Sequence, residues 1–565
     1  MKVVGLYGAL DWDANQFSKP DTYIHDAGAT LFVNGKHVRS INEERLTRIK
    51  DEGNYPRKSI KYVLGEYAPE DIDIVCYVPS YPEMGQEQLV DHTAKRMLRE
   101  SFPNAEVWML SHHLCHAASS VFTAPFNSGS FLTLDGLGSG VWDFASGCVR
   151  FGENNSIGYF DKKKKIFRTF RGSSELGLNS FGEYYCNMSQ FVYDQKHREL
   201  MRQETDLPED VFKNIKFAQD FDITPKEGKV MGLSAYGKNL GEEPPVCFST
   251  EFPKKMFDID RWEMGLPEVH FYDYGIICNY LKGTPEDKAY YTQYWFEKAI
   301  YYYVSELRKD YLEEDNCFAG GCFLNITANT LLKPLFRNIH IPPYTNDSGI
   351  HFGAAAWGSY KMNQTIEMPT NIALLGKSYD DFVPEETNCE YYEDFDELCE
   401  VVAHELDQDK IVGWFQGRSE HGPRALGSRS LLMSPKKAEN KDIMNARVKK
   451  REYWRPFAGI MLEEYVDEYF DEGMITPYML YSQTSITKKL PAISHRDNTC
   501  RIQTVNDELN PRLCQLLRKL EVPVLMNTSF NISGEPIVET PEDAIASFKK
   551  MDIDYLVIGN YLLWN

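Results

Sequence analysis

One arrangement of strands and turns occurs twice in the first part of this chain. The short apolar segment Lys2–Gly8 is followed by a hairpin signal at Asn34-Gly35, and the strand-like segment Ser130–Leu134 runs into a second glycine-rich turn. Each unit places an acidic residue, Asp26 or Asp135, in a loop beside its strands. We therefore predict an α/β fold made of two similar halves with a cleft between them, although the sequence identity between the halves is too low to establish a duplication.

The length of the chain requires a further unit. At 565 residues it exceeds the roughly 250–300 residues that a single hydrophobic core usually supports. The polar stretch from Lys361 to Glu386 has the composition of a boundary, and beyond it Phe395–Leu406 has the spacing of an amphipathic helix and Ile411–Gln416 that of a buried strand. We predict two domains, residues 1–370 and residues 371–565.

Charge and cysteine content limit the partners and the compartment. The chain has 83 Asp and Glu against 61 Lys and Arg, a net charge of −22. We therefore do not expect polymeric nucleic acid or an anionic membrane as a partner. The start of the chain shows no signal peptide, no segment approaches the ~20 apolar residues of a membrane span, and the 12 cysteines form no Cys-x-x-Cys pair. These features predict a cytoplasmic protein with free thiols.

A pair of histidines at helical spacing is the sharpest chemical signal. His112 and His116 are four residues apart, so a helix would place both imidazoles on one face, as in many sites where two histidines bind one metal. Asp135, at the end of a strand, and Asp347 are the candidate third and fourth ligands. Such a set suits Fe(II), Mn(II) or Zn(II). The alternative is that the histidines only cap or fill the helix.

Basic residues are concentrated in one part of this acidic chain. The loop Gly417–Ser430, punctuated by glycine and proline, contains Arg424, and the segment Lys441–Arg455 holds six basic residues against two acidic ones. Guanidinium groups bind phosphate oxygens through paired hydrogen bonds. We predict that Arg424 and Arg455 bind an anion, whereas scattered charge on a solvated helix is the interpretation favoured for Lys441 and Lys450.

Two further groups of residues are compatible with ligand binding. Asn527 and Ser529 end a strand-like segment with small hydrogen-bonding side chains, and the glycines of Gly228-Lys229 and of Gly320-Gly321, the latter followed by Asn325, allow the backbone to approach phosphate or ribose. Neither glycine-rich segment is a P-loop or a Rossmann fingerprint. Ordinary turns are the alternative interpretation of all of them.

Taken together, these motifs resemble the O-carbamoyltransferase family of antibiotic and nodulation-factor biosynthesis, which includes the tobramycin, cephamycin and NodU-type enzymes. The resemblance extends over nearly the whole chain, and the motifs occur in the order found in the family. The segments that carry it are His25-Asp26-Ala-Gly-Ala, Glu43–Lys50, His112–His116, Leu134–Gly136, Glu227–Leu233, Ala319–Asn325, Asp347, Gly422–Gly427, Lys449–Phe457 and Asn527–Asn531.

The resemblance implies a fold and a first reaction. It implies a duplicated actin-like (ASKHA) domain at residues 1–370, similar to the tRNA threonylcarbamoyltransferase, and an α/β YrdC-like domain at residues 371–565. In the family the YrdC-like domain makes carbamoyl-adenylate from carbamoyl phosphate and ATP and releases pyrophosphate. The residues that match its carbamoyl phosphate and adenylate site are Arg424, Lys449, Arg455, Asn527 and Ser529.

The resemblance also implies a second reaction in the actin-like domain, the transfer of the carbamoyl group to an acceptor hydroxyl with loss of AMP. His25 matches the general base, and an ordinary imidazole pKa of roughly 6.5 would suit this role. One divalent metal, Fe(II) or alternatively Mn(II) or Zn(II), would be bound by His112, His116, Asp135 and Asp347. The residues that match the nucleotide site of this domain are Lys50, Gly228, Lys229, Gly320, Gly321 and Asn325.

Some segments depart from the family pattern. The insertion Asp11–Tyr23 and the segment Gly172–Asn179 flank the expected acceptor pocket, so a sugar, an antibiotic-like metabolite and a hydroxymethyl nucleotide all stay open as acceptors. A tRNA threonylcarbamoyl- or hydrogenase-maturation-type carbamoylating protein is a second interpretation of the chain, and a non-catalytic actin-like ATP-binding regulator is a third. A homo-oligomer is compatible with each of them.

Overall fold

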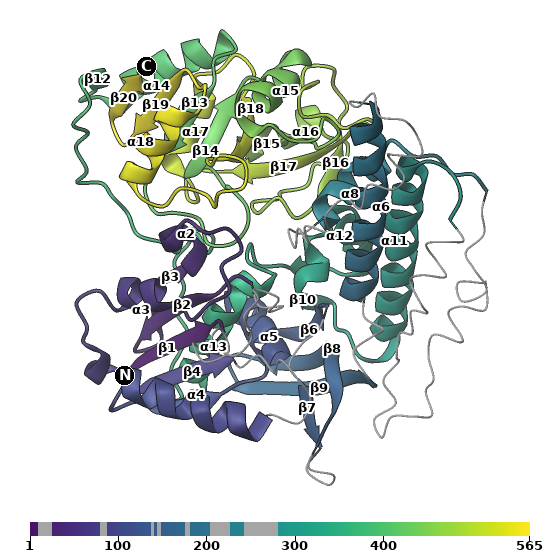
Figure 1. Cartoon of the computed structure of the whole chain (residues 1–565), viewed down its shortest axis with the longest axis vertical. Helices are drawn as coiled ribbons and strands as arrows, with labels where there is room; N and C mark the ends of the chain where they lie inside the picture. Colours follow the sequence, from purple (N-terminus) through teal and green to yellow (C-terminus); the bar gives the residue numbers. More distant parts are fainter. Residues whose placement is uncertain are drawn as a thin grey trace.

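The computed structural model describes residues 1–9, 25–78, 87–136, 140–143, 148–175, 181–203, 226–241 and 281–565. The insertion Asp11–Tyr23 and the end of the segment Gly172–Asn179 lie outside these residues. The described residues form three β-sheets flanked by helices, two from the N-terminal part of the chain and one from the C-terminal part, which lies above them in Figure 1. Among these residues, no helix has the length and apolar character needed to cross a membrane.

The first sheet is built around the N-terminal strand. Its strands are β1 (Lys2–Tyr7), β2 (Gly28–Val33), β3 (Lys36–Asn42), β4 (Ile74–Val78) and β5 (Glu106–Met109). They lie in the order β3-β2-β1-β4-β5, with β2 and β3 antiparallel on one side of β1 and β4 and β5 parallel on the other. The hairpin predicted at Asn34-Gly35 is confirmed, and both turn residues have the positive φ angles, 52° and 80°, that such a tight turn requires.

The second sheet repeats this plan. Its strands are β6 (Ser128–Leu134), β7 (Gly140–Asp143), β8 (Cys148–Asp161), β9 (Ile166–Glu175), β10 (Asp315–Ala319) and β11 (Asn338–His340). The order is β11-β10-β6-β8-β7, and β9 also pairs with β8. Antiparallel β8 and β9 lie on one side of β6 and parallel β10 and β11 on the other. β6, like β1, has an antiparallel neighbour on one side and a parallel neighbour on the other. This repeated strand arrangement confirms the predicted duplicated actin-like α/β fold.

Two helices join the repeated sheets. α5 (His112–Thr123) follows β5 and packs on the second sheet, whereas α13 (Ile350–Lys361) follows β11 and packs on the first. The helices cross closely, because a Cβ atom at Gly353 of α13 would lie 1.8 Å from the carbonyl oxygen of Cys115 in α5. Each helix follows the last strand of its own repeat, so the two helices begin at corresponding places in the two repeats.

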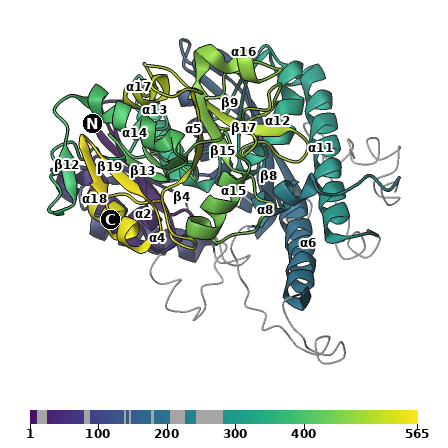
Figure 2. The same ribbon diagram turned by 90° about the horizontal axis from the view of Figure 1, so that it is seen from above.

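The remaining helices of this part are α2 (Glu43–Thr47), α3 (Arg57–Leu64), α4 (Glu87–Ser101), α6 (Phe181–Gln203), α8 (Glu227–Ser234), α11 (Pro285–Asp310) and α12 (Ile326–Leu332), with the short 3₁₀ helices η1 (Pro69–Asp71), η4 (Gly321–Leu324), η5 (Lys333–Leu335) and η6 (Asp347–Gly349). Helices α6, α8 and α11 pack on one another and stand beside the sheets (Figures 1 and 2). The aromatic-rich segment Tyr291–Leu312 has the sequence pattern of a long helix. In the structure this helix, α11, begins earlier, at Pro285, because Thr284 and Asp287 form a capping box.

The C-terminal part forms one sheet of nine strands in the order β12-β20-β19-β13-β14-β18-β15-β17-β16. The strands are β12 (Cys389–Tyr391), β13 (Val412–Phe415), β14 (Arg429–Met433), β15 (Ala458–Leu462), β16 (Ser482–Thr484), β17 (Thr499–Val505), β18 (Val524–Ser529), β19 (Tyr555–Ile558) and β20 (Tyr561–Trp564). The sequence predicts one strand over Tyr555–Leu563, but Gly559 turns the chain with a φ of 57° and divides it into a hairpin.

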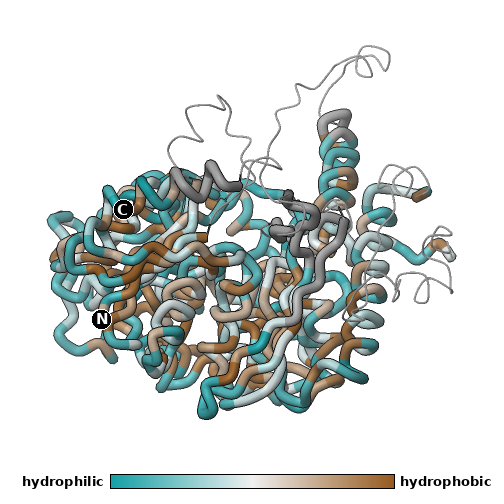
Figure 3. The backbone as a smooth tube through the Cα atoms, turned by 90° about the horizontal axis from the view of Figure 1, so that it is seen from below, coloured by the Kyte–Doolittle hydropathy of each residue, from teal (hydrophilic) through white to brown (hydrophobic). Residues whose placement is uncertain are grey.

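Helices cover this sheet, and apolar clusters lie on both of its faces. The helices are α14 (Phe395–Asp407), α15 (Glu439–Met444), the π-helical turn η7 (Asn445–Lys449), η8 (Glu463–Tyr465), α16 (Val466–Tyr469), α17 (Pro511–Arg518) and α18 (Pro541–Lys550). Figure 3 shows the hydrophobic segments of the chain running through the interior, as expected for packed α/β layers. The division at residue 370 and the YrdC-like character of the C-terminal part stay predictions.

Candidate active site

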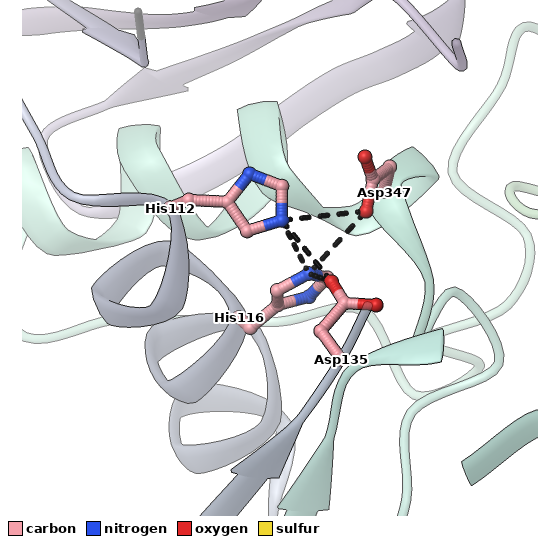
Figure 4. A group of neighbouring side chains, drawn as sticks. All are labelled: His112, His116, Asp135 and Asp347. Carbon is pink, nitrogen blue, oxygen red and sulfur yellow. Dashed lines mark hydrogen bonds and ion pairs between the residues drawn. The ribbon is translucent and has the colours of Figure 1, made fainter. Parts of the chain in front are cut away.

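Four side chains from three segments meet where the two repeats join (Figure 4). His112 and His116 extend from the first turns of α5, Asp135 directly follows β6, and Asp347 begins η6. One ligand atom from each of the four lies within 4.8 Å of the others. The structure therefore brings together all four residues that the sequence analysis singled out as metal ligands.

The distances inside this metal cluster, defined as His112, His116, Asp135 and Asp347, are short. Asp135 Oδ2 lies 3.1 Å from His112 Nε2 and 2.9 Å from His116 Nε2, and the two imidazole nitrogens are 3.1 Å apart. Asp347 Oδ1 lies 3.5 and 3.4 Å from the same two nitrogens. Local structure fixes this arrangement, because Ser111 caps α5 and sets the start of the helical spacing.

The charge balance of the metal cluster depends on its two carboxylates. Burial acts to lower the pKa of His112, but Asp347 and Asp135 outweigh burial and raise it to about 10. The same carboxylates raise the pKa of His116, and the imidazoles in turn hold the pKa values of Asp135 and Asp347 below the usual range. In this state two imidazolium groups neutralise two carboxylates, the same charge that one divalent cation would supply.

Asp347 and its chain neighbour Asn346 form polar contacts on the side of the predicted base His25. The Tyr7 hydroxyl donates to Asp347 Oδ2 (2.8 Å). Asn346 donates to Asp26 Oδ2 (2.8 Å), which lies 2.9 Å from His25 Nδ1. Burial acts to lower the pKa of His25, but Asp26 and then Asp347 raise it to about 10. This value differs from the ordinary pKa expected from sequence, because nearby carboxylates stabilise the imidazolium.

The glycine turn after β10 lies against the metal cluster. Gly320 has a φ of 100°, and a Cβ atom there would lie 2.0 Å from the carbonyl oxygen of Leu134. The backbone N–H of Gly321 donates to Asp135 Oδ1 (3.2 Å), and Asn325 caps α12. Gly320 and Gly321, predicted to contact the nucleotide in the N-terminal domain, are thus adjacent to the metal cluster, and Asn325 follows them at the start of α12.

The other three residues predicted for that nucleotide site lie elsewhere. Lys50 Nζ pairs with Asp51 Oδ1 at 2.9 Å on a partly exposed loop. Gly228 and Lys229 are in the first turn of α8, where Lys229 Nζ lies 3.3 Å from a carboxylate oxygen of Glu452 in the C-terminal part. Their surroundings thus connect Gly228 and Lys229 to the C-terminal part of the chain.

In the C-terminal part, Lys449 lies buried at the end of η7. Its ammonium group donates to Ser529 Oγ (3.2 Å) and Asn531 Oδ1 (2.9 Å), and to the carbonyl oxygens of the same two residues. Asn527 is buried on β18, donates to the carbonyl oxygen of Ala425, and keeps its Oδ1 without a hydrogen-bond partner. Lys449, Ser529 and Asn527 therefore lie around one end of β18.

Arginines extend this cationic region. Burial and the neighbouring Arg501 lower the pKa of Arg424 to about 9, and burial and Arg455 lower that of Arg501 to about 10. Burial, Arg451 and Arg455 lower the pKa of Lys449 well below its usual range. Five cationic side chains are therefore close enough to repel one another, and we call them the anion site: Arg424, Lys449, Arg451, Arg455 and Arg501.

The anion site contains unsatisfied groups. Arg501 Nε is buried without a hydrogen-bond partner. Within the part of the chain that the structure describes, Glu452 is the one carboxylate that forms an ion pair with any of the five, at 3.6 Å from Arg455 Nη1. Clustered, partly desolvated cations are costly unless an anion neutralises them. The arrangement is therefore suited to bind a phosphorylated ligand.

One loop of the C-terminal part connects the two sites. Arg424 Nη2 donates to the carbonyl oxygen of Leu324, in the segment that follows the Gly320-Gly321 turn, at 3.0 Å. In the same loop His421 Nε2 lies 2.8 Å from the carbonyl oxygen of Ser348, and Arg45 of α2 donates to the carbonyl oxygen of Gly422 (2.8 Å). The anion site and the metal cluster are thus linked through a few residues.

Comparison with known families decides the assignment. The family model described as the carbamoyltransferase N-terminus matches residues 19–102 and 81–356, and the carbamoyltransferase C-terminus matches residues 403–565. The chain belongs to the carbamoyltransferase family. This carbamoyltransferase is similar to nodulation protein NolNO of Sinorhizobium fredii, with 30% identity over 100% of this chain and 82% of that protein.

Two further relatives extend the comparison. An uncharacterized protein of Synechocystis is 31% identical over 96% of this carbamoyltransferase and 95% of its own length. The 3'-hydroxymethylcephem-O-carbamoyltransferase of Amycolatopsis lactamdurans is 30% identical over 59% of this chain and 64% of its own. The solved structure of HypF from T. kodakarensis overlaps it with a TM-score of 0.36 and 13% identity, covering 64% of this chain and 47% of that one. The fold described above rests on the strand order and not on this overlap.

Sequence reasoning missed two residues of the carbamoyltransferase's anion site. Arg501 stands alone in β17, with no basic neighbour or glycine-rich turn to mark it, and only the pairing of β17 with β15 brings it to the site. Arg451 lies in the basic segment but was not distinguished from its neighbours. Its contacts distinguish it, because its guanidinium stacks 4.3 Å from the Phe457 ring centroid and donates to Asn445 Oδ1.

Proposed function

We propose that this carbamoyltransferase makes carbamoyl-adenylate from carbamoyl phosphate and ATP at the anion site, and transfers the carbamoyl group to a hydroxyl of a small molecule beside the metal cluster. The observation that carries the proposal is the anion site itself, five cations with a single paired carboxylate, linked to the metal cluster by the Arg424 loop. The printed name of the cephem relative, an O-carbamoyltransferase, supports a hydroxyl acceptor.

The first reaction uses the anion site to hold two phosphorylated substrates. The phosphate of carbamoyl phosphate leaves as inorganic phosphate when water adds, and an oxygen of the resulting carbamate attacks the α-phosphorus of ATP. The bond between the α- and β-phosphates breaks, pyrophosphate leaves and carbamoyl-adenylate forms. The guanidinium groups and Lys449 stabilise the negative charge on the phosphate oxygens during both displacements.

The second reaction takes place beside His25. The acceptor hydroxyl oxygen attacks the carbamoyl carbon, the bond from that carbon to the adenylate oxygen breaks, and AMP leaves. Because Asp26 lies 2.9 Å from His25 Nδ1, a neutral imidazole keeps its proton on Nδ1 and offers Nε2 to receive the hydroxyl proton. This role requires that His25 be neutral, which the carboxylates of Asp26 and Asp347 oppose.

A divalent metal fits the residues of the metal cluster, because two imidazoles and two carboxylates offer donor atoms within 4.8 Å of one another. His112, His116, Asp135 and Asp347 would hold it, with Fe(II) preferred and Mn(II) or Zn(II) as alternatives. When bound, such an ion supplies positive charge that stabilises phosphate oxygens.

In this proposal residues 371–565 form carbamoyl-adenylate and residues 1–370 transfer the carbamoyl group. Carbamoyl phosphate and carbamoyl-adenylate both react with water, so a short passage between the two sites limits their loss. The acceptor is proposed as a hydroxylated small molecule, of which sugars, antibiotic-like metabolites and hydroxymethyl nucleotides are the classes to test.

Exchange of labelled pyrophosphate into ATP tests the first reaction without an acceptor. We expect exchange that depends on carbamoyl phosphate, its loss in Arg424→Ala, and its retention in His25→Ala. Arg447→Gln is a matched control, because Arg447 pairs with Asp552 and Asp554 at the surface of the same basic segment. Absence of exchange in the wild-type protein under every metal condition would contradict adenylate formation.

A further inference from the structure

Glu452 is the one acidic residue in the Lys449–Arg455 segment, and neither proposed reaction uses it. Lys450, the second residue of this segment, has a positive φ of 45° and ends the π-helical turn η7. It then packs on α8. Trp454 is buried and donates from Nε1 to the carbonyl oxygen of Lys229 (3.1 Å). A Cβ atom at Gly232 would lie 3.2 Å from Pro456 Cδ. The loop that carries three cations of the anion site is therefore attached to a helix of the N-terminal part.

The two carboxylate oxygens of Glu452 face the two parts of the chain. Oε1 accepts a hydrogen bond from the Tyr193 hydroxyl of α6 (2.7 Å) and lies 3.3 Å from Lys229 Nζ of α8. Oε2 lies 3.6 Å from Arg455 Nη1. Lys229 Nζ is itself 4.5 Å from the centroid of the Tyr193 ring. Glu452 thus connects a cation of the anion site to two side chains on helices α6 and α8.

The charge of Glu452 is constant under working conditions. Burial acts to raise its pKa, but the Tyr193 hydrogen bond, a backbone N–H, Lys229 and Arg455 lower it to about 2. A permanent carboxylate beside a site for anions weakens anion binding by simple repulsion. A carboxylate at this place must therefore contribute something that offsets the repulsion. The contacts indicate what it contributes, because Glu452 holds Arg455 and is itself held by Tyr193 and Lys229 of the N-terminal part.

We propose that Glu452 is a positioning residue, which sets Arg455 in the anion site by anchoring it to Tyr193 and Lys229 of the N-terminal part. The inference rests on the proposed function of the anion site. It gives Lys229 an anchoring role in place of nucleotide contact. It also makes the geometry of the anion site depend on the docking of α6 and α8, so that the donor site is complete only when the two parts of the chain are engaged.

Binding of inorganic phosphate to the full chain, measured by calorimetry, separates positioning from electrostatics. If Glu452 only repels anions, Glu452→Gln binds phosphate more tightly. If it positions Arg455, Glu452→Gln binds about tenfold more weakly, since a misplaced charge-assisted hydrogen bond costs about 1.4 kcal/mol or more. Equal or tighter binding in Glu452→Gln would overturn the inference.

A variant on the other part of the chain keeps the test independent of the folding of the loop. Tyr193→Phe changes no charge and leaves Glu452 in place, and we expect weaker phosphate binding in the same direction. The double variant Tyr193→Phe/Glu452→Gln should bind no more weakly than Glu452→Gln alone, because both substitutions break one linkage. Full additivity would mean that Tyr193 and Glu452 act separately, and would overturn the inference.

Controls and kinetics complete the test. Lys288→Met is the matched control for Lys229→Met, because Lys288 also lies over an aromatic ring of α6, that of Phe191, at 5.5 Å, and bonds to Gln195 of the same helix. We expect Lys229→Met to weaken phosphate binding and Lys288→Met to leave it unchanged; equal effects would contradict the anchoring role.

In pyrophosphate exchange, Glu452→Gln should raise the KM for carbamoyl phosphate about tenfold with kcat within about twofold, and Glu452→Asp should restore part of the loss.

Failure of the inference differs from failure of the proposed function. If the wild type binds phosphate, Arg455→Ala abolishes binding and Glu452→Gln does not weaken it, the anion site stands and the positioning role is wrong. If the wild type binds neither phosphate nor carbamoyl phosphate, both are wrong.

Discussion

Arg424 of the C-terminal part donates a hydrogen bond from Nη2 to the carbonyl oxygen of Leu324 in the N-terminal part, at 3.0 Å. Leu324 ends η4, which follows the glycine turn whose Gly321 N–H donates to Asp135 of the metal cluster. One side chain therefore belongs to the anion site and contacts the segment that supports the metal cluster. We therefore expect substitutions in one site to alter the activity of the other.

Arg424→Lys is expected to separate charge from geometry. The substitution keeps a positive charge but loses the planar guanidinium group, which can donate hydrogen bonds to the Leu324 carbonyl oxygen and to a bound phosphate at the same time. We expect pyrophosphate exchange to fall by about 10- to 100-fold, the range set by one or two charge-assisted hydrogen bonds. Steady-state exchange measured at several carbamoyl phosphate concentrations gives the result, and wild-type rates would show that charge alone is sufficient.

Arg501→Gln tests one of the two residues of the anion site that were not predicted from the sequence. Its Nε is buried without a partner and its guanidinium lowers the pKa of Arg424. We expect the KM for carbamoyl phosphate to rise about tenfold or more, because the anion loses one charged donor. Arg518→Gln is the control, since Arg518 pairs with Asp507 on the surface. Similar effects of the two substitutions would exclude Arg501 from the site.

The fold and the metal cluster were predictable because their signals are local. The hairpin at Asn34-Gly35 is set by two turn residues, and the histidine pair by a spacing of four in α5. Asp135 could be suggested because it ends a strand-like segment, and Asp347 because it lies in the polar segment Tyr344–Gly349. The anion site was only partly predictable, because Arg501 reaches it through the strand pairing of β15 with β17.

The pKa of His25 was not predictable from sequence for a related reason. The adjacent Asp26 is visible in the sequence, but the approach of Asn346 and Asp347 depends on how the two repeats pack. Likewise, Lys229 has the sequence surroundings of a nucleotide ligand, and only the docking of α8 on the Lys449–Phe457 loop shows its pairing with Glu452. Contacts between distant segments decide these roles.

Metal binding should release protons. The pKa of His112 is raised to about 10 and that of His116 is also raised, so both imidazoles must lose a proton before they can coordinate a cation. We expect at least one proton released for each Fe(II), Mn(II) or Zn(II) bound at pH 7.5, measured by calorimetry in buffers of different ionisation enthalpy.

Two variants check this proton count. His112→Ala/His116→Ala should bind no metal and release none. His113→Asn should release as many protons as the wild type, because burial lowers the pKa of His113 and the neutral ring lies 3.3 Å from Ser156. A release near zero in the wild type would show that the cluster does not bind metal through these imidazoles.

Asp26→Asn should lower the pKa of His25. The carboxylate of Asp26 contributes most to raising that pKa against the effect of burial, so its removal leaves the imidazole easier to deprotonate. The chemical shift of His25 followed against pH would show the change. An unchanged pKa would mean that Asp26 does not hold the His25 imidazole protonated.

Acid should destabilise the folded chain before its carboxylates titrate. Burial and Lys162 lower the pKa of His340 to about 3, and the ring lies 2.8 Å from the Thr123 hydroxyl. The unfolded chain binds a proton at this histidine at roughly pH 6.5, whereas the folded chain does not until the pH is much lower. Below pH 6.5 the unfolded state therefore binds more protons, and stability falls as the pH falls, by about 1.4 kcal/mol for each pH unit and each such histidine.

His340→Gln isolates this contribution. The variant should have a lower free energy of unfolding at pH 7.5, where a buried hydrogen bond is altered, but a slope between pH 6 and pH 4.5 that is smaller by about one proton. Urea unfolding at a series of pH values gives both quantities. His404→Gln, on the exposed face of α14, should leave the slope unchanged. A slope in His340→Gln equal to that of the wild type would mean that His340 is protonated in the folded chain, and that its burial against Thr123 does not keep the imidazole neutral.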